Sequence, residues 1–186
     1  TTVRGSNLMT TITSSISSYP YPGSAAKATA RTDCAGTTCT YAEEMTTYAN
    51  WWAYYHTRMQ TMKTSVSRAF KNVDNRYRVG YTTISYTGGT DGSRFQHIDK
   101  FELAQKNTWY TKLFAADPSS STPLRGALSK AGMIFAHKLS GADDPVQYSC
   151  QQNFTILSTD GYWNTGSETS SYGPKRLDGT LVGTGP

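Results

Sequence analysis

The chain has 186 residues, a mass of 20.4 kDa and a formal net charge of +5, with 37% hydrophobic and 17% charged residues. This length suits one domain with a real core, and no apolar run approaches the roughly 20 residues of a membrane-spanning helix, which excludes an integral membrane protein. The many aromatic residues argue against general disorder, and a surface made polar by Ser and Thr hydroxyls suits an exported bacterial protein.

Residues 1–40 carry no sustained hydrophobic period. Ser, Thr, Gly and Pro dominate them, which predicts an irregular segment with one short strand near 8–16. Cys34 and Cys39 lie at its end, and no second pair of Cys or His stands at zinc-ligand spacing. We therefore predict a short-loop disulfide between them, in keeping with export. Cys150 is left over, either buried at the start of a strand or paired with a cysteine of another chain.

The clearest signal is a long amphipathic helix over residues 41–71. Thr40 and Glu43 have the spacing of a capping box at its start, and apolar residues follow at steps of three and four. We interpret this stripe as core packing, not as a cofactor site. Its members are Met45, Tyr48, Ala49, Trp52, Tyr55, Met59, Met62, Val66, Ala69 and Phe70.

Strands and helices alternate beyond this helix. Strands are predicted over 78–86 and 95–98, followed by a helix over 101–115 that turns Leu103, Trp109, Leu113 and Phe114 inward. Thr122 at the N-cap and Pro123 at the first helical position open another helix, with one apolar face: Leu124, Ala127, Leu128, Ala131, Ile134 and Phe135. Phe154–Leu157 is too apolar for a half-exposed strand, and the chain is loop-like from residue 165. This alternation predicts an α/β fold with helices packed on the faces of a sheet.

Enzyme templates do not fit the sequence. None of the three His residues stands at a metal-ligand spacing such as H-E-x-x-H, and no Gly-rich phosphate loop or EF-hand loop is present. Residues 24–27 match S-x-x-K, but the S-D-N and K-T-G elements that give this motif its meaning are absent. We predict that the chain is not an enzyme.

Two oxygen-bearing residues fall at positions where ligands bind in α/β domains. Thr122 begins a helix after a loop, and Asp160 ends the predicted strand 154–157. A hydroxyl and a carboxylate are suitable ligands for a hard divalent cation, although two oxygens are too few for an octahedral ion. The alternative is structural, with Thr122 as a helix cap and Asp160 as the first residue of a turn.

Several sequence blocks together resemble the N-terminal von Willebrand factor A-like domain of PilY/PilC-type proteins, which are tip-associated adhesin and biogenesis factors of bacterial type IV pili. The resemblance covers roughly residues 30–165. The blocks are Glu43–Met45, Ala49–Trp51, Arg58–Gln60, Arg78–Gly80, Ser121–Arg125 and, most specific, Asn153–Asn164.

This resemblance implies a central, mostly parallel sheet flanked by helices, with a partial domain over 41–164, an irregular insertion over 1–40 and a tail over 165–186. It also implies a metal-ion-dependent adhesion site built from D-x-S-x-S, a Thr and an Asp. Thr122 resembles the second element and Asp160 the third, while the first is expected in an upstream segment absent from this chain. Residues 117–121 match D-x-S-x-S literally, but they follow a helix and abut Thr122, so we interpret them as a Ser-rich loop.

The resemblance implies a non-enzymatic adhesion or assembly domain at a pilus tip or cell surface, exported through the periplasm. Its expected partners are minor pilins, other tip components and a host or abiotic surface. Its expected cofactor is one divalent cation (Mg²⁺, Mn²⁺ or Ca²⁺) that needs the upstream segment. The alternatives are a structural spacer with a degenerate metal site and, more weakly, a basic nucleic-acid-binding module formed by the Arg and Lys residues of 58–78.

Overall fold

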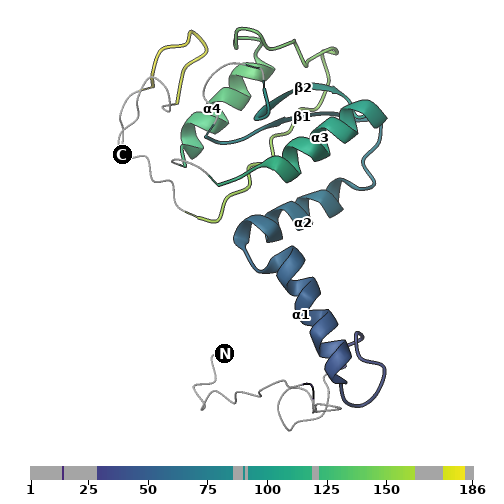
Figure 1. The fold of residues 1–186 in the computed structure, drawn as a ribbon. Helices are drawn as coiled ribbons and strands as arrows, with labels where there is room; N and C mark the ends of the chain where they lie inside the picture. The colour runs from purple at the N-terminus through teal and green to yellow at the C-terminus, as the bar shows by residue number, and fades with distance from the viewer. Residues whose placement is uncertain are drawn as a thin grey trace. The chain divides into compact units, whose positions relative to one another are not determined.

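The computed structural model describes residues 14, 29–85, 90, 92–118, 122–161 and 174–182 (Figure 1). The chain divides into two compact units, Thr1–Thr61 and Met62–Pro186, and each is described by itself. The predicted strand near 8–16, the Ser residues of the 117–121 loop and most of the tail lie outside the described residues. The domain boundaries predicted above stay a prediction.

The helix predicted over 41–71 is in fact two helices. α1 spans Tyr41–Tyr55 and begins with the predicted capping box at Thr40. The chain then breaks at His56 and Thr57, and α2 spans Arg58–Phe70. A second capping box explains the break: the Gln60 backbone N–H donates to Thr57 Oγ1 at 3.1 Å, and the Thr57 N–H donates to Gln60 Oε1 at 3.1 Å. These two hydrogen bonds cap the N-terminus of α2, so a new helix begins at Arg58.

The two halves of the predicted apolar stripe have different environments. α1 has no buried residue, so the prediction of core packing is wrong there; Tyr48 and Trp52 are half-exposed, at 50% and 52%. In the second unit, Met62, Val66 and Phe70 of α2 are partly buried against a core cluster of Phe101, Trp109 and Leu113, so the prediction holds for them.

A two-stranded antiparallel sheet forms the centre of the second unit. β1 (Arg78–Thr82) pairs with β2 (Phe95–Lys100), and the register joins Arg78 to Lys100 and Thr82 to Phe95. The α/β class and the places of these strands are as predicted, but the mostly parallel sheet is wrong. The connection between them is Gly-rich and carries no helical period, so it returns the chain antiparallel instead of forming a helical crossover.

α3 (Leu103–Ala115) packs on this sheet (Figure 1). Trp109 and Leu113 are buried as predicted, whereas Leu103 and Phe114 are exposed, contrary to the prediction. Trp109 Nε1 donates to the Gly80 carbonyl at 3.3 Å, and Gln105 Nε2 donates to the Val79 and His97 carbonyls at 2.9 and 2.7 Å. Side chains of α3 therefore satisfy backbone acceptors of both strands.

α4 (Leu124–Phe135) contributes Ile134 to a second small core cluster with Phe95 and Ala142. Its N-cap is Pro123, so the prediction that Thr122 caps this helix is wrong. Of the predicted apolar face, Ile134 is buried and Leu128 is 51% exposed. Met133, which is not part of the predicted face, is buried beside Ile134.

The strand predicted at Phe154–Leu157 is not formed. Residues 151–159 belong to no helix, strand or turn, and Phe154 and Ile156 are each 76% exposed. Cys150 is free and exposed, so the prediction that it is buried is wrong, and its pairing with another chain stays a prediction.

Candidate functional site

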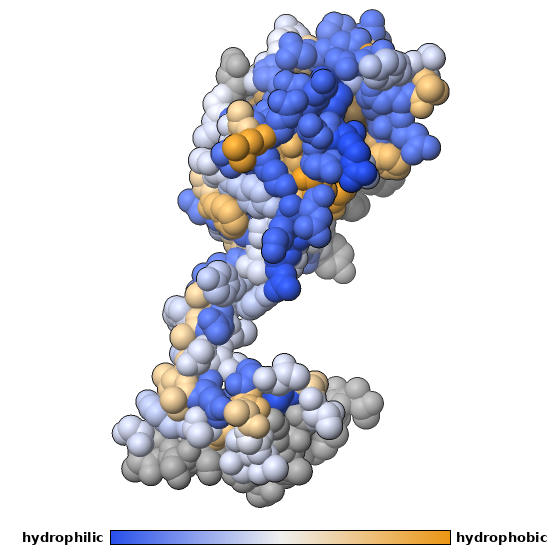
Figure 2. Space-filling view, turned by 90° about the vertical axis from the view of Figure 1, so that its right-hand side faces the viewer, coloured by the Kyte–Doolittle hydropathy of each residue, from blue (hydrophilic) through white to orange (hydrophobic). Residues whose placement is uncertain are grey.

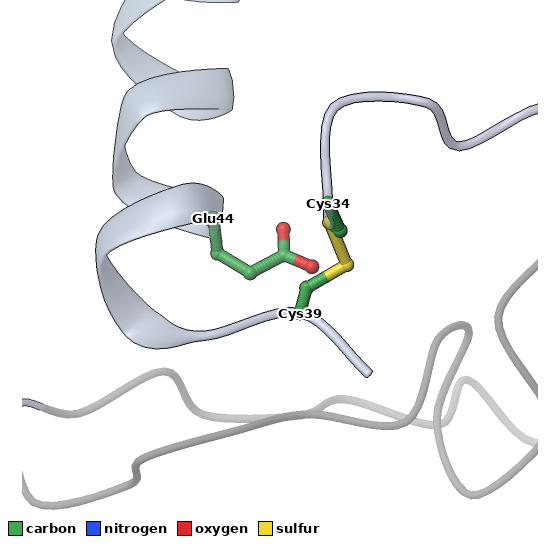
Figure 3. A group of neighbouring side chains, drawn as sticks. All are labelled: Cys34, Cys39 and Glu44. Carbon is green, nitrogen blue, oxygen red and sulfur yellow. A yellow bond between two sulfur atoms is a disulfide. The ribbon is translucent and has the colours of Figure 1, made fainter. Parts of the chain in front are cut away.

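The predicted disulfide joins Cys34 to Cys39 and closes the loop that precedes α1. Both cysteines are buried, although the loop around them is mostly exposed. The first turn of α1 holds this loop in place, because Glu43 accepts hydrogen bonds from the backbone N–H groups of Ala35 and Thr40 at 3.0 and 2.8 Å. Figure 3 shows the neighbouring Glu44 carboxylate directed at the disulfide.

Arg31 connects the disulfide to α1. Its guanidinium makes two 2.7 Å hydrogen bonds to the Asp33 carboxylate, and its Nη2 lies 3.1 Å from Glu44 Oε1. The same Nη2 lies 3.2 Å from Cys34 Sγ and 3.4 Å from Cys39 Sγ. We call Arg31, Asp33, Glu44 and the disulfide the Arg31 clamp. The side chains of Arg31 and Glu44 are only 15% and 11% exposed, so this ion pair is better shielded from water than an ordinary surface pair.

The Asp33 carboxyl of the clamp is stabilised in its ionised form. The Arg31 guanidinium, and after it the Thr47 hydroxyl that donates at 2.6 Å, holds the pKa of the Asp33 carboxyl far below its ordinary value. Asp33 is therefore an anion at every physiological pH. The disulfide is predicted from the sequence, but the role of Arg31 is not, because an Arg two residues before an Asp in a polar loop is not a distinctive pattern.

The clamp does not fit a divalent cation. Among the described residues, Cys34, Cys39 and Glu44 place their ligand atoms within 4.8 Å of one another. Both sulfurs are bonded to each other, however, and the Arg31 guanidinium already supplies the positive charge beside them. A hard cation such as Mg²⁺ also prefers oxygen ligands, so we assign this group a structural role.

The two predicted cation ligands lie in different surroundings. Thr122 is partly buried and directly precedes Pro123, which is almost fully buried; Asp160 is exposed in a bend. In the described part of the chain, no group of three His, Cys, Asp or Glu side chains includes Asp160. Since the strand expected to end at Asp160 is missing, no strand end directs its carboxylate toward Thr122. Their convergence stays a prediction.

An exposed aromatic cluster covers part of α1. It consists of Tyr48, Trp51, Trp52 and His56, with the Trp52 and His56 rings stacked at a centroid distance of 4.1 Å. Residues 45–57 include no charged side chain. Apolar side chains are also visible among hydrophilic ones on the face drawn in Figure 2. Of these residues, Tyr48 and Trp52 belong to the apolar stripe predicted to face the core, and the structure exposes both.

Three of the six basic residues of 58–78 have partners within the chain. Lys63 Nζ donates to the Phe114 carbonyl at 2.7 Å, Arg76 pairs with Asp74 at 2.9 Å, and Arg78 pairs with Asp99 at 3.3 Å. The nucleic-acid-binding alternative stays a prediction.

The fold and the clamp define a class of protein: a disulfide-containing α/β chain with exposed aromatic side chains on α1. Comparison with known proteins relates the chain to one group within this class. The chain is 27% identical over 143 residues to the type IV pilus biogenesis factor PilY1 of Pseudomonas aeruginosa strain PAO1, and 25% identical over 141 residues to PilY1 of strain PAK. These alignments cover 67% and 68% of this chain.

The resemblance seen in the sequence is thus confirmed, and the chain is related to PilY1-type proteins. The aligned part spans 12% of the length of the PAO1 and PAK proteins. No family model matches the chain, and no solved structure matches it. The von Willebrand factor A-like fold is therefore not confirmed.

Proposed function

We propose that this chain is a non-enzymatic assembly or adhesion module of a type IV pilus-associated protein, acting outside the cytoplasm at the pilus tip or cell surface. The observation that carries this proposal is the similarity to PilY1, a type IV pilus biogenesis factor, over two thirds of the chain. Minor pilins, other tip components and a host or abiotic surface are the partners we propose.

Two structural features support this proposal. The Cys34–Cys39 disulfide is typical of proteins that work in an oxidising compartment. The aromatic cluster on α1 supplies exposed Trp and Tyr side chains, which are enriched in protein interfaces because they combine large apolar area with a polar group. As for membranes, no helix among the described residues has both the length and the apolar character needed to cross one.

A chimera tests the proposal. In Pseudomonas aeruginosa, the aligned segment of PilY1 is deleted in one strain and replaced by this chain in another. We expect the replacement to restore surface pili, counted by electron microscopy, and attachment to a surface relative to the deletion strain. A chimera that is made and exported but restores neither would contradict the proposal.

The finer part of the proposal is a metal-ion-dependent contact through Thr122 and Asp160. It is supported by their chemistry, since hydroxyl and carboxylate oxygens suit Mg²⁺, Mn²⁺ and Ca²⁺. The other ligands of the ion would be water and oxygens outside the described residues. Calorimetric titration of the full-length protein with each ion at millimolar concentration tests this contact. We expect binding that Asp160→Asn removes and that Glu102→Gln, a change at the exposed carboxyl of the N-cap residue of α3, leaves intact.

The second candidate is a structural spacer without a working metal site. It is favoured by the surroundings of Asp160, which has no acidic cluster around it among the described residues. Under this alternative, Asp160→Ala in the full-length protein leaves piliation and attachment unchanged, and no ion binds in calorimetry.

A further inference from the structure

Residues 153–155 read Asn-Phe-Thr, which is the N-x-[ST] tripeptide that accepts N-linked sugars, with no Pro in the middle position. It is the only tripeptide of this kind in the 186-residue sequence. In a folded protein, such a tripeptide is usable only where a transferase can reach it, which means a surface loop. Its place in the structure is therefore the deciding observation.

The tripeptide lies in an exposed, irregular segment. Residues 151–159 belong to no helix, strand or turn, and Asn153, Phe154 and Thr155 are all exposed, Phe154 at 76%. In Figure 1 this segment is part of the yellow-green stretch without helix or arrow. Between Phe154 and Ser158, no N–H or carbonyl group hydrogen-bonds to any part of the chain that the structure describes. A transferase can therefore bind this backbone without breaking any secondary structure.

Gln151 holds the acceptor side chain at the start of this segment. Gln151 Nε2 donates to the Pro145 carbonyl at 2.9 Å and to Asn153 Oδ1 at 2.8 Å, and Asn153 Nδ2 donates to the Gln151 carbonyl at 3.3 Å. This long bond uses one of the two Nδ2 protons, and the other has no acceptor among the described residues. The Thr155 hydroxyl makes no hydrogen bond within that part of the chain either, so it is available to a transferase.

We propose that Asn153 is an acceptor of N-linked glycosylation, and that the donor is a sugar activated at its anomeric carbon C1 by a diphosphate. Asn153 Nδ2 attacks C1, so that the Nδ2–C1 bond forms and the bond from C1 to the diphosphate oxygen breaks. The diphosphate leaves with the bonding electron pair, and one Nδ2 proton passes to a base of the transferase. Nucleotide-linked and lipid-linked sugars share this chemistry. The modification does not depend on the proposed pilus role.

Mass spectrometry of the full-length protein isolated from its own cells tests the proposal. We expect the peptide that contains Asn153 to be heavier by whole sugar residues. Asn153→Gln and Thr155→Val should abolish this increase, whereas Thr155→Ser, which keeps the hydroxyl, should retain it. Asn75→Gln is the matched control and should also retain it, because Asn75 is exposed but is not followed by Ser or Thr two residues later.

Two incubations of the folded chain identify the donor. The soluble fraction of the same cells with a uridine-diphosphate hexose tests the nucleotide-linked sugar, and the membrane fraction tests the lipid-linked one. We expect one of the two to add sugar to Asn153, and labelling by neither would exclude the donor class. An Asn153 that carries no sugar in protein from the cells would overturn the proposal. A sugar that survives Thr155→Val would overturn it as well, because the tripeptide would then not be what the transferase recognises.

Discussion

At the scale of single residues, Arg31 is the side chain with the most consequence in the first unit. It pairs with Asp33 and Glu44 and contacts both sulfurs of the disulfide. We expect Arg31→Ala to lower the free energy of unfolding of this unit by about 1–3 kcal/mol, because it leaves the largely buried Glu44 side chain without its charge-assisted hydrogen bond. Amide hydrogen exchange along α1 measures this loss.

Arg76→Ala is the control for this prediction. The pair between Arg76 and Asp74 is as short as the Arg31 pairs, at 2.9 Å, but its side chains are 78% and 47% exposed. Surface pairs of this kind add little stability. Equal effects of the two substitutions would show that shielding from water does not strengthen the Arg31 clamp.

The lowered pKa of Asp33 predicts that the stability of the first unit depends on pH. Arg31 and then Thr47 hold its folded-state pKa below its unfolded value of about 4, so the unfolded chain binds the proton more tightly. The stabilisation is therefore complete above about pH 4 and is lost as the pH falls below it. Hydrogen exchange of α1 between pH 2.5 and 7 should show this loss, and Asp33→Asn should flatten the curve. If the Asp33→Asn variant keeps the same pH dependence of hydrogen exchange, Asp33 is not the source of that dependence. Asp144→Asn, which changes a carboxyl outside the clamp, is the control.

At the scale of elements, the capping box at Thr57 decides that α1 and α2 are separate helices. Thr57→Ala removes the acceptor for the Gln60 N–H, and we expect it to destabilise the start of α2 by about 1 kcal/mol. Circular dichroism during thermal unfolding measures the loss. Thr46→Ala is the control, since the Thr46 hydroxyl only donates to the Ala42 carbonyl within α1. A greater loss from Thr46→Ala would contradict the assignment.

Gly80 sets the close approach of β1 to β2. A Cβ at this position would lie 2.6 Å from Ile98 Cγ1 and 2.9 Å from the Gln96 carbonyl oxygen, and that backbone atom cannot move away cheaply. We expect Gly80→Ala to cost about 1–3 kcal/mol in chemical denaturation. Gly132→Ala in α4, where a Cβ meets nothing within 4 Å, should instead stabilise the protein by about 0.5–1 kcal/mol. If Gly80→Ala leaves the stability unchanged, the two strands can move apart enough to make room for the added Cβ.

At the scale of the whole molecule, we expect the disulfide to stabilise the first unit and not the second. Cys34→Ser with Cys39→Ser should lower the stability of the first unit by about 2 kcal/mol, because the bond limits the freedom of the unfolded loop. Hydrogen exchange should rise in α1 and stay unchanged in α3, which belongs to the other unit. Increased exchange in α3 would contradict this independence.

Local patterns predicted a large part of the fold. The capping box at Thr40, the strands around Val79 and Phe95, and the buried positions Trp109 and Leu113 depend on neighbours a few residues away, and all were predicted correctly. The second capping box was equally visible as Thr57-x-x-Gln60, but the continuous apolar stripe concealed it. Of the candidate site residues, the Cys34–Cys39 bond was predicted correctly, whereas the convergence of Thr122 and Asp160 stays a prediction.

The sequence by itself determined the class of the protein, its disulfide and most of its helices and strands, because capping, periodicity and cysteine spacing are local properties. Only the tertiary structure decided that β1 and β2 pair antiparallel, that Arg31 joins the disulfide to α1, and that the apolar residues of α1 and of 152–159 face solvent. The physical reason is that burial depends on what packs against a side chain. An apolar pattern shows which side chains gain from a partner, but it does not supply the partner.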